Sequence, residues 1–131
     1  MVELYHFASR QNWPEIAAAG QIMPLYPKVQ GDPPVTRTVH LTSSATGAGL
    51  SRGKPREVRI TVELPASEVV AHIDWISCLP AASQASLTGQ VPLYQPGERE
   101  DPDTWFVVAR PIAADRWRLV VDMESGVQLW P

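Results

Sequence analysis

Two short segments of the sequence combine an imidazole with small hydroxyl side chains and could bind a polar ligand. Residues 4–9 read Leu-Tyr-His-Phe-Ala-Ser and contain His6, and residues 39–44 read Val-His-Leu-Thr-Ser-Ser and contain His40. Hydroxyl and imidazole groups donate and accept hydrogen bonds without adding net charge, which suits ribose hydroxyls and a carboxamide. Each histidine taken alone is better explained as a partly buried or surface residue, whereas two such segments favour a binding site.

Both segments are expected to be strands, and strand geometry decides where their side chains point. Successive residues of a strand face opposite sides of a sheet. If Phe7 lies in the core, His6 therefore points outward or into a cleft. His40 likewise alternates with apolar neighbours before its strand reaches the hydroxyls.

The elements that must position these segments are short, and loops rich in proline and glycine separate them. A helix is expected after Asn12, which can cap it together with Glu15, with Pro14 in the first turn and Gly20 at the end. Strict alternation predicts the clearest strand at 58–64. We also expect strands at 3–7, 38–42, 105–109, 117–121 and 127–130, with Trp117, Leu119 and Val121 on one face of their strand. Residues 69–76 are expected to be a strand running into a turn, and 111–115 a turn or single helical turn. A mobile loop is expected at 43–55 and a long loop at 80–102.

These elements indicate one α+β domain spanning residues 1–131, with a small, mostly antiparallel sheet and one or two short helices. The single cysteine, Cys78, excludes an internal disulfide. A net charge of −3 gives no general attraction to nucleic acid. The sequence has no leader-like segment and no long apolar run, so we expect a cytoplasmic protein without membrane contact.

Common phosphate-binding and metal-binding motifs do not fit. The segment 49–54 resembles a phosphate loop, but Ala48 breaks the glycine spacing and Pro55 stands where a magnesium-binding hydroxyl is needed. The three histidines and Cys78 stand at none of the close spacings that structural zinc sites use. No metal is therefore expected.

Three parts of the chain are similar to one known superfamily. The strand Tyr-His-Phe-Ala-Ser at 5–9, the helix start Asn-Trp-Pro-Glu-Ile at 12–16 and Gly20 resemble the opening of the ADP-ribosyltransferase superfamily, especially the DarT-type DNA ADP-ribosyltransferases. Residues 105–112, Trp-Phe-Val-Val-Ala-Arg-Pro-Ile, resemble the late strand of that superfamily, and residues 40–44 are loosely similar to its middle strand. The resemblance implies an ADP-ribosyltransferase-like split sheet, NAD as substrate, and transfer of ADP-ribose to a macromolecule, nucleic acid or protein.

The resemblance also implies roles for individual residues. His6 would hold a ribose of NAD with help from Ser9, and Thr42 and Ser43 would line the nicotinamide pocket. Arg59 could pair with the pyrophosphate through its planar guanidinium, although an exposed surface arginine is an equal interpretation. Two further residues of the same segments complete the expected NAD site, namely Tyr5 and His40.

The catalytic acid is where the sequence departs from the superfamily. The late-strand glutamate is replaced by Thr104 or Trp105, so Asp103 is the preferred acid beside His6, and the acids at 98 and 100 lie too far upstream. Cleavage of the glycosidic bond passes through an oxocarbenium-like state that needs negative charge beside the ribose. If no acid reaches the site, the domain binds a nucleotide without turning it over.

Three functions therefore stay open. The first is an NAD-dependent ADP-ribosyltransferase or NAD glycohydrolase. The second is a module of the same fold that binds a nucleotide or a protein without catalysis. The third is a plain interaction protein, in which the tryptophans at 105, 117 and 130 serve the core or an interface.

Overall fold

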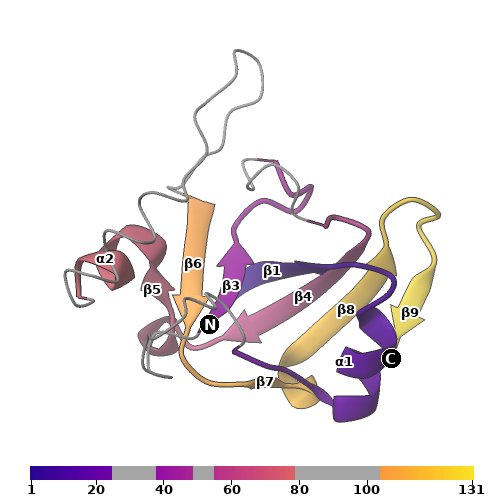
Figure 1. Cartoon of the computed structure of the whole chain (residues 1–131), viewed down its shortest axis with the longest axis horizontal. Coiled ribbons are helices and arrows are strands. Elements are labelled where there is room, and N and C mark those ends of the chain that lie inside the picture. Colours follow the sequence, from indigo (N-terminus) through magenta and orange to yellow (C-terminus); the bar gives the residue numbers. More distant parts are fainter. Residues whose placement is uncertain (25–37, 49–54, 79–103) are drawn as a thin grey trace.

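The computed structural model describes residues 1–24, 38–48, 55–78 and 104–131. Within them, a seven-stranded sheet has the order β5-β6-β3-β1-β4-β8-β9, with every neighbouring pair antiparallel (Figure 1). Its strands are β1 (Val2–Ala8), β3 (Val39–Thr42), β4 (Val58–Leu64), β5 (Val70–Ala71), β6 (Trp105–Val108), β8 (Trp117–Asp122) and β9 (Gln128–Trp130). A second sheet pairs β2 (Gln21–Ile22) with β7 (Ile112–Ala113). The helices are α1 (Trp13–Ala19) and α2 (His72–Ser77), and 3-10 turns lie at Ala66–Glu68 and Ala114–Arg116. The predicted α+β class with a mostly antiparallel sheet and short helices is confirmed.

The hydrophobic core lies on the face of the large sheet formed by alternate residues of β4. Val58, Ile60 and Val62 are 0% exposed, as the alternation at 58–64 predicts. Each fully buried aliphatic side chain stabilises the fold by about 1.5–3 kcal/mol. We call this side of the sheet the core face and the other side the far face. Other elements add buried residues to the same core: Leu4, Ile22, Val39, Leu41, Leu64, Val108, Ile112, Trp117 and Val120.

Helix α1 begins and ends near the predicted residues, but its amino-terminal cap differs from the prediction. Asn12 has helical backbone angles and makes no side-chain cap bond, so the expected capping box is wrong. Instead the Ser9 hydroxyl accepts a hydrogen bond from the Asn12 N–H at 3.1 Å. Gly20 ends the helix at φ 67°, the left-handed conformation that glycine adopts without a steric penalty.

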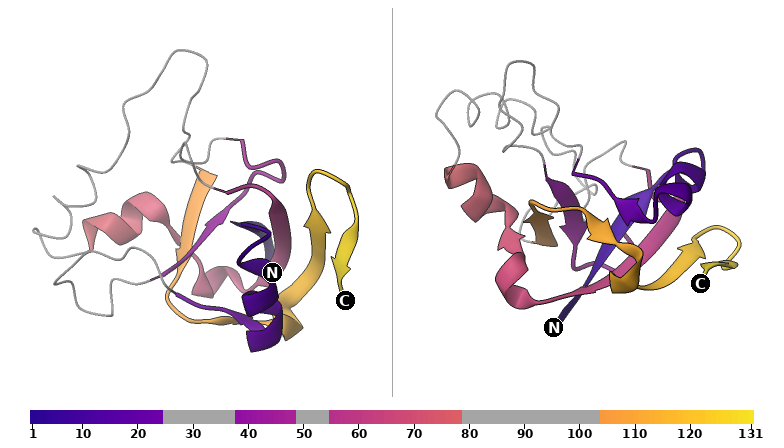
Figure 2. Two further views of the ribbon diagram at one scale, coloured as in Figure 1. Left: turned by 45° about the vertical axis from the view of Figure 1, so that its right-hand side comes forward. Right: turned by 90° about the horizontal axis from the view of Figure 1, so that it is seen from below.

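The segment predicted as a strand running into a turn at 69–76 contains a helix. Only Val70–Ala71 is a strand, and α2 follows it directly. The six residues of α2 are too few to show helical periodicity in the sequence, and contacts from the rest of the fold hold them. The helices α2 and α1 lie at opposite ends of the sheet (Figure 2).

The prediction that Trp117, Leu119 and Val121 share one face is wrong at Trp117, the first residue of β8. β8 pairs with β4 through Thr61↔Leu119 and then Val62↔Trp117, so Arg118 is an extra residue at a β-bulge. The bulge changes the face of the residues that follow it. As a result Trp117 and Val120 are both buried, whereas Leu119 is only half-buried.

The large sheet is split between β1 and β3. β1 pairs with β4 along all of Val2–Ala8, but within the described residues it pairs with β3 only through Tyr5↔Thr42. Figure 1 shows β3 and β6 running at a marked angle to β1 and β4. The sheet thus consists of a β3 half-sheet (β5, β6 and β3) and a β4 half-sheet (β1, β4, β8 and β9), joined at one residue pair.

None of the helices in the described part of the chain is long and apolar enough to cross a membrane.

Candidate functional site

His6 lies at the split, directly after the residue pair that joins the half-sheets. Its partner on β4 is Ile60, so the imidazole is on the core face, and it is half-buried. Its Nδ1 is 3.0 Å from the main-chain oxygen of His40. A carbonyl only accepts hydrogen bonds, so Nδ1 carries the proton in this contact. In the neutral ring, Nε2 is then an acceptor.

The hydrogen-bond pattern of β3 directs the carbonyl of His40 toward β1. The Ser43 N–H bonds to the Thr104 carbonyl at 3.0 Å, and main-chain groups alternate in direction along an antiparallel strand. The groups of residues 41 and 39 therefore point to β6, and those of Thr42 and His40 point to β1. Thr42 pairs with Tyr5 on that side, whereas the carbonyl of His40 accepts a hydrogen bond from the His6 side chain across the split.

The register separates His6 from two other expected site residues. Tyr5 and Thr42 are paired and share a face, so His6 is on the opposite face from Thr42 and also from His40. Phe7 is buried, as expected, but on the far face. His6 and Phe7 thus point to opposite faces, as expected, and His6 is half-buried on the core face. His6 and the Thr42 hydroxyl do not share a crevice.

Two other polar residues do share the side of the sheet on which His6 lies. The bond between Ser43 and Thr104 continues the β3–β6 register one step past the strands. By the alternation of β3 and β6, both residues face the same way as Leu41, which belongs to the core face. Ser43 is exposed and Thr104 half-buried. The core face at the split thus presents an imidazole and two hydroxyl-bearing residues.

Arg59 is a half-buried residue of the far face and not an exposed surface arginine. Its Nη1 donates a hydrogen bond to the Ala45 carbonyl at 2.8 Å. Its guanidinium lies over the ring of Tyr5, 5.4 Å from the centroid. The Tyr5 hydroxyl donates to Glu3 at 2.9 Å, and this hydrogen bond raises the pKa of the phenol. Arg59 and Tyr5 are therefore together, but on the opposite face from His6.

The first part of the predicted mobile loop is a turn with several hydrogen bonds. The Gly47 N–H bonds to the Ser44 carbonyl, and the Ser44 N–H bonds to the Thr42 hydroxyl at 3.1 Å. Nε of Arg56 donates to the Gly47 carbonyl at 3.0 Å. Residues 43–48 are thus held in place by Arg59 of β4 and by Arg56, two residues before that strand.

Four aromatic rings gather where α2 covers the far face. His72 contacts Trp105, Trp75 and His40, with ring centroids 5.2, 5.6 and 5.7 Å apart. Burial lowers the pKa of His72. Sequence reasoning missed the His72 and Trp75 contribution because it did not predict α2. The T-shaped contacts among these rings are typical of packing within a protein.

The remaining expected residues have other surroundings. The Ser9 hydroxyl accepts the hydrogen bond from the Asn12 N–H, in the turn that leads into α1. Asp103 lies outside the described residues. Among the described residues, no group of three or more histidine, cysteine, aspartate or glutamate side chains could hold a metal ion.

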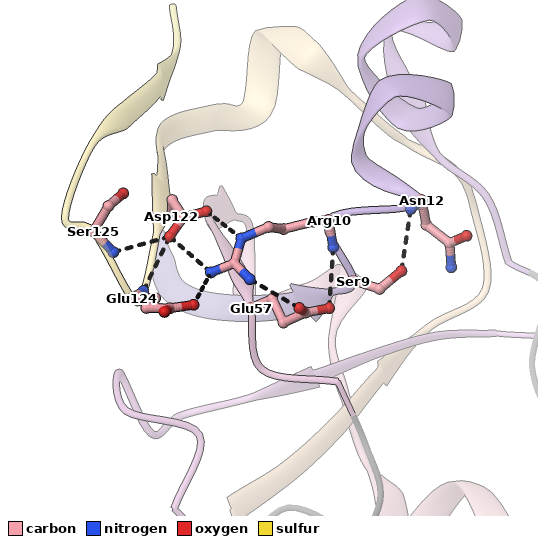
Figure 3. Close-up of polar contacts among 7 residues, drawn as sticks. All are labelled: Ser9, Arg10, Asn12, Glu57, Asp122, Glu124 and Ser125. Atoms are coloured by element: carbon pink, nitrogen blue, oxygen red, sulfur yellow. Dashed lines mark hydrogen bonds and ion pairs between the residues drawn. The ribbon is translucent and has the colours of Figure 1, made fainter.

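An ion-pair network that sequence reasoning did not predict surrounds Arg10 (Figure 3). Its guanidinium contacts Asp122 at 2.6 Å, Glu124 at 2.8 Å and Glu57 at 3.0 Å. These contacts join the end of β1 to the start of β4 and to the turn between β8 and β9. The hydrogen bond from Arg10 holds the pKa of Asp122 well below its usual range. We assign this network a structural role within the β4 half-sheet.

Comparison of the chain with protein families, with curated proteins and with solved structures finds no match.

Proposed function

We propose that this protein binds NAD where the sheet splits and transfers ADP-ribose from NAD to a macromolecular acceptor, a nucleic acid or a protein. The proposal depends on where the three segments that resemble ADP-ribosyltransferases lie. Residues 5–9, 40–44 and 105–112 are far apart in the sequence, yet their strands β1, β3 and β6 are neighbours in the sheet. The first, middle and late strands of the resemblance therefore adjoin one another, and this supports a common site.

His6 supports the proposal through the state of its ring. The His40 carbonyl orients the ring through Nδ1, and an imidazole in a fixed orientation suits a ribose hydroxyl. A side chain oriented before the ligand arrives lowers the entropy cost of binding. Ser43 and Thr104 face the same side and add hydroxyls for the ribose and the carboxamide.

The transfer itself breaks one bond and forms another. The bond between nicotinamide and its ribose breaks with both electrons leaving on nicotinamide. A nucleophilic oxygen or nitrogen of the acceptor bonds to the same ribose carbon and loses its proton. Positive charge develops on the ribose, and a nearby carboxylate stabilises it. Asp103, directly before Thr104 in sequence, is the residue that we propose for this role.

A second function is favoured by the composition of the strands at the split. β3 reads Val-His-Leu-Thr and β6 reads Trp-Phe-Val-Val, so neither strand contains an acid. Thr104 or Trp105 occupies the position of the superfamily's glutamate. A domain without a carboxylate at the ribose would bind the nucleotide, or a protein partner, and leave the glycosidic bond intact.

The two functions are separated by following nicotinamide. The purified protein is incubated with labelled NAD and either DNA or cell lysate, alongside His6→Asn, Asp103→Asn and the control Asp115→Asn, an acid of the 3-10 turn between β7 and β8. Transfer predicts nicotinamide release and labelling that both site variants abolish and the control retains. A melting temperature that rises with NAD concentration, without release, favours the binding module. No release and no thermal response to NAD would exclude both nucleotide functions.

A further inference from the structure

Three side chains of the β4 half-sheet region donate hydrogen bonds to main-chain carbonyls of residues 40–47, which we call the β3 segment. His6 donates to His40 at 3.0 Å, Arg59 to Ala45 at 2.8 Å, and Arg56 to Gly47 at 3.0 Å. The donors come from both sides of the sheet, since His6 is on the core face and Arg59 on the far face. Side chains thus bridge the split along most of the β3 segment.

The His6 contact takes the place of a main-chain bond between β1 and β3, because the His40 carbonyl points to β1. Ala45 and Gly47 lie in the turn after β3, where Arg59 and Arg56 supply the donors for their carbonyls. An arginine is suited to this role because its charged, planar guanidinium forms short, strong hydrogen bonds. Arg59 also stacks over Tyr5, which belongs to the joining pair. It therefore contacts the β3 segment and the joint between the half-sheets at once.

The contact between Arg56 and the β3 segment is also close. Gly47 is buried and has φ +75°, and a Cβ atom at this residue would lie 3.1 Å from Cδ of Arg56. The left-handed backbone favours glycine here, and a larger residue would require the Arg56 side chain to shift by a few tenths of an ångström. The turn and the arginine thus pack closely against each other.

We propose that Arg59, assisted by Arg56, is a positioning residue that sets the distance between the β3 segment and His6 across the split. This inference rests on the proposed function, because its consequence is the placement of Ser43 and Thr104 relative to the imidazole that binds ribose. Thr104 moves with the segment because its carbonyl bonds to Ser43. Arg59 itself is on the opposite face from His6 and does not touch the ligand.

The test compares Arg59→Met, which keeps a long, flexible side chain but removes the hydrogen-bond donor, with Arg59→Lys, which keeps one charged donor. Arg118→Met is the matched control, because Arg118 on β8 pairs with Glu63 on β4 and stays within one half-sheet. We expect Arg59→Met to speed amide hydrogen exchange in residues 43–48 about tenfold and to weaken NAD binding by a similar factor. Arg59→Lys should restore most of both, and Arg118→Met should change neither.

The outcomes separate this inference from the function on which it rests. Exchange in residues 43–48 that is equal in Arg59→Met and Arg118→Met would overturn the role of Arg59. Faster exchange with unchanged NAD affinity would overturn the link to the ligand site. If the wild type does not bind NAD, the proposed function fails, and exchange alone decides whether arginine holds the segment. Should Arg59→Met not fold, Arg56→Met, at an exposed residue, provides the same comparison for the Gly47 contact.

Discussion

The Nδ1 atom of His6 and the main-chain oxygen of His40 lie 3.0 Å apart, across the gap between two halves of one sheet. The contact places an imidazole where a main-chain N–H would stand in a continuous ladder. It has two consequences. It gives the His40 carbonyl a hydrogen-bond donor, and it fixes the tautomer of His6, with the proton on Nδ1.

The two consequences can be separated by substitution at His6. The amide nitrogen of asparagine takes the position of Nδ1, so His6→Asn can keep the bond to the His40 carbonyl, whereas His6→Ala cannot. We expect His6→Ala to lower the free energy of unfolding by about 1–2 kcal/mol, because a half-buried carbonyl loses its donor. His6→Asn should lose less than half as much. Urea unfolding measures both, and equal losses would contradict the proposed bridging role.

Two glycines with the same backbone conformation differ in their surroundings. Gly47 has φ +75° and Gly126 has φ +74°, but a Cβ atom at Gly47 would meet Arg56 at 3.1 Å, and one at Gly126 would meet nothing within 4 Å. Alanine at either residue is strained by about 1–2 kcal/mol in the left-handed conformation. We expect Gly47→Ala to be the more destabilising in urea unfolding, because it also displaces Arg56. The prediction fails if Gly126→Ala costs as much.

The network around Arg10 predicts a dependence of stability on acid. The hydrogen bond from Arg10 is the main reason that the pKa of Asp122 is below the ordinary 3.8. Because the folded protein holds the proton less tightly than the unfolded chain, this stabilisation is complete above about pH 4 and decreases as the pH falls further. Asp122→Asn should therefore melt at a lower temperature than the wild type at pH 7. The difference should shrink below pH 4, and a constant difference would argue against the network.

His72 predicts a second pH effect near neutrality. Its ring is enclosed by Trp75, Trp105 and His40, and burial lowers its pKa below the ordinary 6.5. The unfolded chain then binds a proton at a pH where the folded protein does not, so stability decreases as the pH falls from 6.5 toward the lower folded pKa. NMR titration of the ring should give a midpoint below 6.5. His72→Gln should lose this part of the pH dependence of the melting temperature, and a midpoint above 6.5 would refute the prediction.

Much of the fold follows from local patterns that need no partner. The alternation at 58–64 identifies β4 because a strand with one core face must place apolar residues at every second position. Gly20 marks the end of α1 because the left-handed conformation there disfavours other residues. The short helix α2 could not be predicted, because its six residues depend on rings of β3 and β6 that are distant in the sequence.

The sequence by itself determined that the chain is an α+β domain with short antiparallel strands, and it identified His6, Thr42, Ser43 and Arg59 among the candidates. Only the tertiary structure decided which of them are neighbours. A strand has side chains on both faces, and the face on which one lies relative to another strand depends on register. The pair Tyr5↔Thr42 sets that register, so that Thr42 and Arg59 lie away from His6 while Ser43 faces its side. Pairing between strands more than thirty residues apart is a property of the folded sheet.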